Sequence, residues 1–180
     1  MRDFQARVVR KDRAYNGKLL KIDRELVEFP DGKRSELETI RHPGAAAVLP
    51  FLDDERVVLI RQYRHAVGGV IVEVPAGKLD IAGEAPEICA QREVQEETGY
   101  LCHRIVPLGS ILTTPGFTNE VIWLYEGHDL EPGPAAPEEH EWIETFNLPL
   151  DQAGAMVRRG EISDAKSVAC ILQAVLRRQS

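Results

Sequence analysis

Three glutamates lie close together near the middle of the chain, at Glu93, Glu96 and Glu97. On a helix, residues three and four apart share a face, so these carboxylates repel one another by about 0.2–0.5 kcal/mol per pair. Gly99 is placed to end such a helix, and negative charge is unfavourable at a helix C-terminus. A hard divalent cation such as Mg²⁺ would offset both effects, because it binds carboxylate oxygens and bridges them to substrate phosphates. The alternative is a solvated acidic helix end.

The helix that must position these carboxylates is expected from roughly Glu84 to Thr98. Pro86 suits its first turn. Ala90 and Val94 lie beside the glutamates and can pack inward, so the carboxylates border the buried side of the helix. The loop before the helix is rich in glycine, whose backbone can approach other groups closely.

Most of the remaining sequence is typical of strands, with two further helices at 150–159 and 164–178. Ser163 is a candidate N-cap for the second of these helices. Strands around one central helix, with helices at the end, predict a mixed α/β sandwich and not a regular βαβ alternation. The expected strands are 6–12, 18–29, 34–42, 45–52, 56–64, 69–75, 102–112 and 120–128.

Composition narrows the class of protein. Apolar residues make up 43% of the 180 residues and no apolar run approaches a membrane span, which predicts a soluble domain with no membrane partner. The N-terminus lacks the apolar stretch of a signal peptide, and the three cysteines form no CxxC pair, so we expect a cytoplasmic protein without a zinc site. A net charge of −7 argues against a general nucleic-acid binder.

The segment from Gly77 to Tyr100 resembles the Nudix box. In words, this pattern is Gly, five residues, Glu, seven residues, Arg-Glu, an aliphatic, any residue, Glu-Glu, any residue, Gly and a bulky apolar residue. Residues 92–100 fit its end completely, and seven residues separate Glu84 from Arg92. Six residues, and not five, separate Gly77 from Glu84, which we interpret as a loop insertion that leaves the helix register intact.

Three further segments, 40–50, 57–80 and 164–174, look like the ADP-ribose pyrophosphatase branch of that family. In that branch a proline lies fifteen residues beyond the box, and Pro115 stands there in this chain. The resemblance implies an α+β fold, an αβα sandwich with a mixed sheet and an N-terminal β-hairpin extension. Residues 1–42 would be the strand region that reaches across a homodimer, and 43–180 the hydrolase domain.

The resemblance also implies the metal site. Glu93, Glu97 and the backbone carbonyl of Ala76 would bind Mg²⁺, or Mn²⁺ as the alternative. Glu96 would be a third carboxylate at the site, and Arg92 would orient the glutamates by ion pairing. Metal ions there would neutralise a diphosphate, orient the attacking water and stabilise the leaving group.

Three other acidic residues are less certain members of this site. The loop that contains Glu139 and Glu141 resembles a segment that closes over the site in relatives. Glu141 would bind metal and Glu139 would be the general base, whereas the alternative is a solvated acidic loop. Glu84 is more simply a helix-start acid that stabilises the N-terminus than a metal ligand.

Substrate contacts follow from the same resemblance. Arg64 ends a strand and would clamp a phosphate bidentately, the alternative being an ordinary surface arginine. Some relatives stack adenine between aromatic side chains of the N-terminal strands, but Leu19 and Leu37 occupy those places here, which leaves the base preference open. The other candidate substrate contacts are Glu73, Glu38, Arg41, Pro115, Gly116 and Phe117.

The resemblance therefore implies hydrolysis of ADP-ribose to AMP and ribose 5-phosphate. GDP-mannose or another nucleoside diphosphate sugar is the alternative small-molecule partner. A hypothesis of another class is a Nudix module that senses ADP-ribose without cleaving it. Such modules commonly lose catalytic glutamates, whereas this chain keeps Glu93, Glu96 and Glu97.

Overall fold

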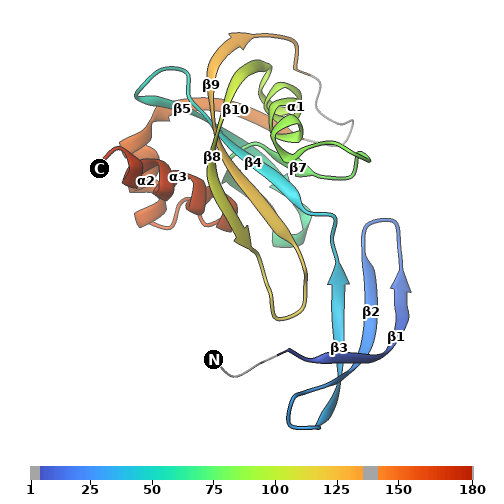
Figure 1. The fold of residues 1–180 in the computed structure, drawn as a ribbon. Coiled ribbons are helices and arrows are strands. Elements are labelled where there is room, and N and C mark those ends of the chain that lie inside the picture. The colour runs from blue at the N-terminus through green and yellow to red at the C-terminus, as the bar shows by residue number, and fades with distance from the viewer. Residues whose placement is uncertain (1–4, 136–141, 180) are drawn as a thin grey trace. The chain divides into compact units, whose positions relative to one another are not determined.

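The computed structural model describes residues 5–135 and 142–179, and the chain divides into two compact units. The N-terminal unit comprises Met1–Pro43 and Leu112–Val121, and the larger unit comprises Gly44–Ile111 and Ile122–Ser180. Among the described residues, no helix combines the length and the apolar character needed to cross a membrane. The elements, labelled in Figure 1, are β1 (Arg7–Asn16), β2 (Lys21–Glu28), β3 (Arg34–Arg41), β4 (Ala45–Pro50), β5 (Arg56–Arg64), the 3₁₀ turn η1 (His65–Val67), β6 (Gly69–Glu73), β7 (Ala76–Lys78), α1 (Pro86–Thr98), β8 (Tyr100–Leu112), β9 (Val121–Pro132), β10 (Ile143–Pro149), α2 (Leu150–Arg158) and α3 (Ala165–Arg177).

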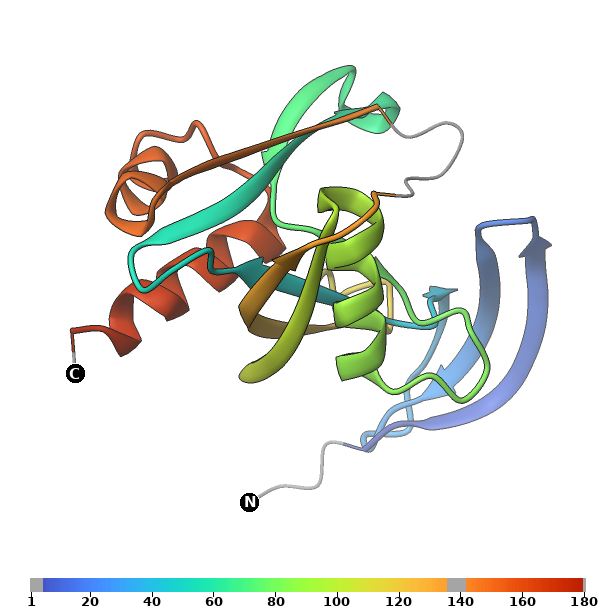
Figure 2. The same ribbon diagram turned by 90° about the horizontal axis from the view of Figure 1, so that it is seen from above.

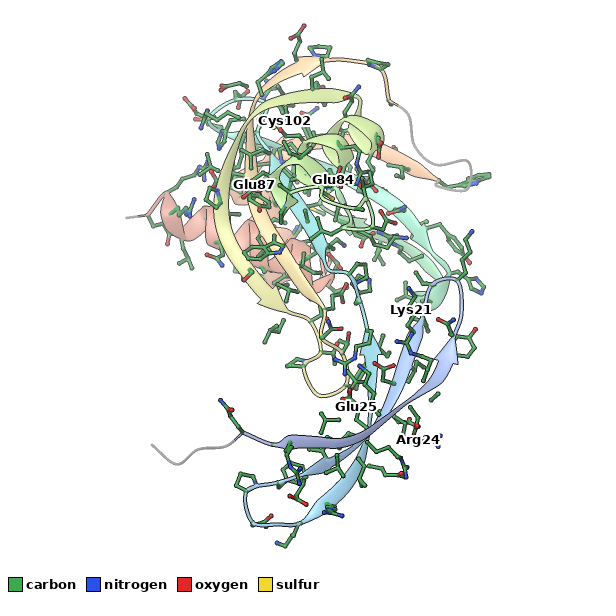
Figure 3. All side chains as sticks on the ribbon, turned by 45° about the vertical axis from the view of Figure 1, so that its right-hand side comes forward. Lys21, Arg24, Glu25, Glu84, Glu87 and Cys102 are labelled. Carbon is green, nitrogen blue, oxygen red and sulfur yellow. The ribbon has the colours of Figure 1, made fainter. Side chains whose placement is uncertain are left out.

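The N-terminal unit is built on an antiparallel sheet in the order β1-β2-β3. The three strands match the ranges expected at 6–12, 18–29 and 34–42, and the predicted hairpin is the pair β2 and β3. Side chains alternate along β2, so Arg24 and Glu25 point to opposite faces (Figure 3). Asp23 and Glu25 are buried on one face and are paired with cations from β1 and β3. The buried face of this strand therefore depends on ion pairs as well as on apolar packing.

The larger unit is an αβα sandwich, as predicted. Its two sheets have the orders β10-β5-β6 and β7-β4-β9-β8, and β4 runs parallel to β9 but antiparallel to β7, so the second sheet is mixed. Figures 1 and 2 show α1 on one side of β4 and the pair α2 and α3 on the other. Alternate side chains of β4 pack on opposite faces of the sheet. Leu49 belongs to the apolar cluster that includes Ile171 of α3, and Val48 belongs to the one that includes Val94 of α1. Because both faces are covered, every residue of β4 is buried.

Helix α1 begins and ends for the reasons read from the sequence. Pro86 occupies its first turn, and Gly99 caps its C-terminus with a φ of 73° while its N–H donates to the Gln95 carbonyl at 2.9 Å. The preceding loop turns at Gly83, whose φ of 82° suits glycine. The extra residue before the helix is thus accommodated in the loop, and the helical spacing of the glutamates is kept.

Two strands were not predicted as such. β10 pairs antiparallel with β5 along Ile143–Pro149, a stretch for which the sequence predicts no element. Its residues are exposed or half-buried, so the burial alternation that marks a strand is weak there. The strand predicted over 69–75 ends at Glu73, and the chain re-enters a sheet as the short strand β7 after Pro75, which lacks the N–H needed for a ladder.

The N-cap of α3 is Asp164 and not the predicted Ser163. The Asp164 carboxylate accepts the Ser167 N–H at 3.0 Å and the Ser167 hydroxyl at 2.6 Å. A carboxylate can accept both bonds and also carries negative charge at the positive end of the helix dipole, so it replaces the hydroxyl one residue earlier.

We expect Asp164→Ala to lower the free energy of unfolding by about 1–2 kcal/mol, because it removes the cap and one partner of Lys166. Ser163→Ala is the matched control and should change the free energy of unfolding by less than about 0.5 kcal/mol. Urea denaturation followed by circular dichroism measures both. Equal losses for the two variants would contradict the assignment of the cap.

Candidate metal centre

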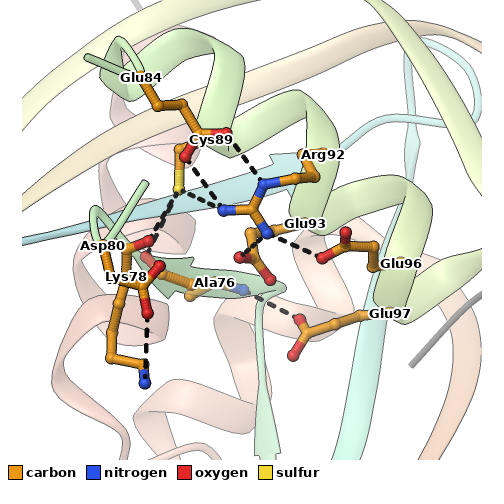
Figure 4. Close-up of polar contacts among 10 residues, drawn as sticks. Ala76, Lys78, Asp80, Glu84, Cys89, Arg92, Glu93, Glu96 and Glu97 are labelled. Carbon is orange, nitrogen blue, oxygen red and sulfur yellow. Dashed lines mark hydrogen bonds and ion pairs between the residues drawn. The ribbon is translucent and has the colours of Figure 1, made fainter. Parts of the chain in front are cut away.

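Two carboxylates of α1 face the backbone of β7 (Figure 4). Glu93 and Glu97 are both buried, and Glu97 accepts the Ala76 N–H at 3.0 Å. A side chain at position 77 is excluded by the close approach of the helix, because a Cβ built on Gly77 would overlap the carboxylate of Glu93. The absence of a side chain at Gly77 is what lets this carboxylate reach the strand.

Arg92 forms ion pairs with glutamates of the acidic face of α1, which consists of Glu93, Glu96 and Glu97, and with Glu84 before the helix. Its guanidinium donates to Glu93 Oε1 at 2.6 Å and to Glu96 Oε2 at 2.8 Å, and it holds both oxygens of Glu84 at 2.9 and 3.1 Å. The neighbouring carboxylates raise the pKa of Arg92, so it stays cationic. One partly buried cation thus offsets the repulsion expected among the glutamates, in the planar geometry that only arginine provides.

Glu84 is not the helix-start acid that the sequence predicts, but it forms an ion pair with Arg92. It precedes α1, which begins at Pro86, so it does not lie in the first helical turn. Its side chain is 7% exposed, and both of its carboxylate oxygens accept hydrogen bonds from Arg92. The ion pair with Arg92 lowers the pKa of Glu84, against the effect of burial, and keeps the carboxylate ionised.

The donor set at this place suits a hard divalent cation, since carboxylate and backbone oxygens are the ligands such ions prefer. The bare backbone at Gly77 also lets the Glu93 carboxylate lie directly against β7. Within residues 5–135 and 142–179, however, no three acidic, histidine or cysteine side chains are gathered closely enough to hold an ion by themselves. Glu139 and Glu141, predicted to complete the site, lie outside the described residues.

Two other predicted residues, Arg64 and Glu73, are bound to each other. Glu73 is 2% exposed, and its Oε2 accepts from Arg64 Nε at 2.8 Å. Its other oxygen accepts from Lys166 Nζ at 2.5 Å. Because both oxygens are engaged, Glu73 is placed to orient Arg64 and is poorly placed to bind substrate directly.

Lys166 is the residue of this group that sequence reasoning missed. It stands in the first turn of α3, where the helix dipole disfavours a cation, and yet it is buried. The signal in the sequence is a lysine in the first turn of a helix, directly before a largely apolar stretch.

Four predicted substrate contacts gather in the N-terminal unit. Glu38, Pro115, Gly116 and Phe117 all line an open cavity of about 520 Å³ within that unit. Arg41 turns away to Asp23 and Glu25, with Nε–Oδ2 and Nη2–Oε1 distances of 2.9 and 2.5 Å. The remaining lining residues are Arg24, Glu36, Leu37, Thr39, Thr118 and Asn119.

The segment 112–121 is hydrogen-bonded to β3 and to His42 within the same unit. The Ile40 N–H donates to the Phe117 carbonyl at 2.7 Å, and the His42 N–H donates to Asn119 Oδ1 at 2.8 Å. The predicted loop residues Pro115 to Phe117 are therefore held against the strand that carries Glu38.

Comparison with known proteins matches most of the chain to a family model and to curated relatives. The family model described as the NUDIX domain matches residues 41–169. The "Methanol dehydrogenase activator" of Bacillus methanolicus is 36% identical over 93% of this chain and 91% of that protein. The "ADP-ribose pyrophosphatase" of Bacillus subtilis is 35% identical over 95% of this chain and 93% of that protein. The "GDP-mannose pyrophosphatase" of Cronobacter sakazakii is 34% identical over 82% of this chain and 85% of that protein.

A solved structure described as an "ADP compounds hydrolase" superimposes with a TM-score of 0.88 and covers 100% of this chain and 99% of that one. The two sequences are 21% identical. At this identity the likeness shows a shared fold.

Proposed function

This chain belongs to the NUDIX domain family, and we propose that it hydrolyses the diphosphate bond of ADP-ribose to AMP and ribose 5-phosphate. The observation that carries the proposal is the intact acidic face of α1. Glu93 and Glu97 lie against β7, and Arg92 holds Glu93, Glu96 and the upstream Glu84 in one array.

The chemistry that this site must perform is attack by water on one phosphorus of the diphosphate. A bond from the water oxygen to phosphorus forms, the bond from that phosphorus to the bridging oxygen breaks, and a proton is released. Members of the family generally use divalent metal ions, and when bound here such an ion would supply positive charge to the diphosphate. We propose Mg²⁺, with Mn²⁺ as a substitute, bound by Glu93, Glu97 and the Ala76 carbonyl.

The chain's own residues have three tasks in this proposal. Arg92 keeps the glutamates in register, as its contacts with Glu93 and Glu96 allow. Arg64 binds a substrate phosphate through its guanidinium. Glu139 takes the proton from water, and Glu141 adds a metal ligand.

We also propose a cytoplasmic homodimer in which the strands of residues 1–42 contact the partner. All three cysteines are buried free thiols, which suits a reducing compartment. Sedimentation velocity would show a species of twice the monomer mass, and a purely monomeric protein would overturn this part of the proposal.

The test of the proposed reaction is product analysis by chromatography with Mg²⁺ present. ADP-ribose and GDP-mannose are offered separately, and AMP from ADP-ribose at the higher kcat/KM supports the proposal. GMP from GDP-mannose at much higher kcat/KM would make GDP-mannose the substrate and would leave the proposed diphosphate hydrolysis unchanged. Tight ADP-ribose binding by calorimetry without turnover would instead make the chain a sensor.

Gly77→Ala is expected to lower kcat/KM by about 10-fold to 100-fold, because the added Cβ displaces the Glu93 carboxylate. Gly69→Ala is the matched control, since a Cβ there meets nothing within 4 Å. Steady-state kinetics on both variants, with circular dichroism to check folding, measures the effect. An unaltered kcat/KM in folded Gly77→Ala would show that the approach of Glu93 to β7 is not needed.

A further inference from the structure

The first turn of α3 holds the end of β6 through buried polar contacts. Lys166 Nζ lies 2.5 Å from Glu73 Oε1 and 2.9 Å from Asp164 Oδ2. Glu73 and Lys166 are 93 residues apart in the sequence and both are buried. The ion pair therefore joins two distant parts of the larger unit.

A buried ammonium at a helix N-terminus is unfavourable unless it is compensated, because both desolvation and the dipole oppose it. Here the two carboxylates compensate it. Burial acts to raise the pKa of Asp164, but Lys166 and Ser167 outweigh this effect and hold that pKa below its ordinary value. Apolar residues at these two positions would be buried at a lower desolvation cost. Stability alone therefore does not explain the buried ion pair of Lys166 and Glu73.

The same turn also fixes the backbone. The Ser167 hydroxyl accepts the Val74 N–H at 2.8 Å, directly after Glu73 in the chain. Two residues further along, Ala76 donates its N–H to Glu97. The segment that leads from Glu73 to the metal centre is thus anchored by α3 at both a side chain and a backbone group.

Arg64 lies on the other side of Glu73. Its Nε donates to Glu73 Oε2 at 2.8 Å, and its side chain is 38% exposed. Its terminal nitrogens make no hydrogen bond with the part of the chain that the structure describes. A guanidinium held by Nε alone presents its two terminal groups outward, in the arrangement that a phosphate would accept.

We infer that Lys166 is a positioning residue: it holds Glu73 from one side, so that Glu73 fixes Arg64 for a substrate phosphate from the other. The four residues Asp164, Lys166, Glu73 and Arg64 form a chain of alternating charge that ends at a partly exposed guanidinium. This inference rests on the proposed function, in which Arg64 contacts the diphosphate.

The link from Lys166 to Arg64 can be tested without substrate. In ¹⁵N NMR spectra of the full chain, the Arg64 Nε–H signal is assigned by its loss in Arg64→Lys. We expect Lys166→Met to speed exchange of this proton with water by about tenfold, because Glu73 is no longer held. Lys166→Gln, which can still donate to Glu73, should give a smaller change and serves if the Met variant does not fold. An unchanged exchange rate in both would overturn the inference.

Kinetics then test the functional consequence. We expect Lys166→Met to raise KM for ADP-ribose by about 10-fold to 100-fold with a smaller change in kcat, and Lys166→Gln to restore part of the loss. In an Arg64→Met background the effect of Lys166→Met should vanish, because the two act through one contact. Equal effects in both backgrounds would mean that Lys166 is merely structural.

Two comparisons separate this inference from its premise. Val168→Ala, on the same helix but packed against the apolar cluster, should lower stability without changing KM. If the wild-type chain cleaves no nucleoside diphosphate sugar while Arg64 exchange still responds to Lys166, the proposed function fails and the positioning contact stands. If hydrolysis occurs but neither exchange nor KM responds, the inference fails alone.

Discussion

Glu97→Gln should lower kcat/KM for ADP-ribose by at least about 10²–10³-fold, the range found when one preorganised electrostatic group is lost from an active site. The substitution keeps the size of the side chain, and the amide oxygen can still accept the Ala76 N–H that Glu97 accepts at 3.0 Å. What disappears is the negative charge that would bind a divalent cation. The fold should therefore remain while the chemistry is lost.

The matched control for this prediction is Glu87→Gln. Glu87 lies in the first turn of the same helix and is exposed, so it undergoes the same chemical change away from β7. It should keep kcat/KM within about twofold, as surface substitutions usually do. Mg²⁺ titration followed by calorimetry should show weaker binding for Glu97→Gln alone. If the two variants behave alike, the acidic face of α1 is not the metal centre.

The sequence was sufficient to predict α1 and its acidic face, because the signals for that element are local. Pro86 at the start and Gly99 at the end are backbone preferences that do not depend on the rest of the fold. The spacing of the glutamates then follows from helical geometry alone. The sandwich also followed from the order of elements, with strands around one central helix and two helices at the end.

What could not be predicted depends on contacts between distant residues. β10 is a strand because β5 offers it a partner, and its own residues show little alternation of burial. Arg41 forms ion pairs with Asp23 and Glu25, which only the pairing of β2 with β3 brings next to it, and its contact with substrate stays a prediction. Lys166 likewise acquires its partner Glu73 from 93 residues away.

Arg92→Gln is the variant in which we expect the largest combined loss of stability and activity. Glu84 would keep a carboxylate that is 7% exposed and would lose the cation that holds both its oxygens. Breaking a buried pair in this way costs about 3–5 kcal/mol, and we expect about 2–4 kcal/mol here because 26% of the Arg92 side chain is exposed. Release of Glu93 and Glu96 should also lower kcat/KM by about 10-fold to 100-fold.

The double variant Glu84→Gln/Arg92→Gln separates these two losses. It removes one of the two buried carboxylates that lose this cation, so part of the stability should return, as measured by urea denaturation. The activity should stay low, because Glu93 and Glu96 would still lack the guanidinium that bridges them at 2.6 and 2.8 Å. If kcat/KM recovered together with stability, Arg92 would serve only to hold Glu84 and the loop before α1. Recovery of stability alone would instead mean that one arginine performs two separable tasks: neutralising a buried acid and setting the geometry of the metal ligands.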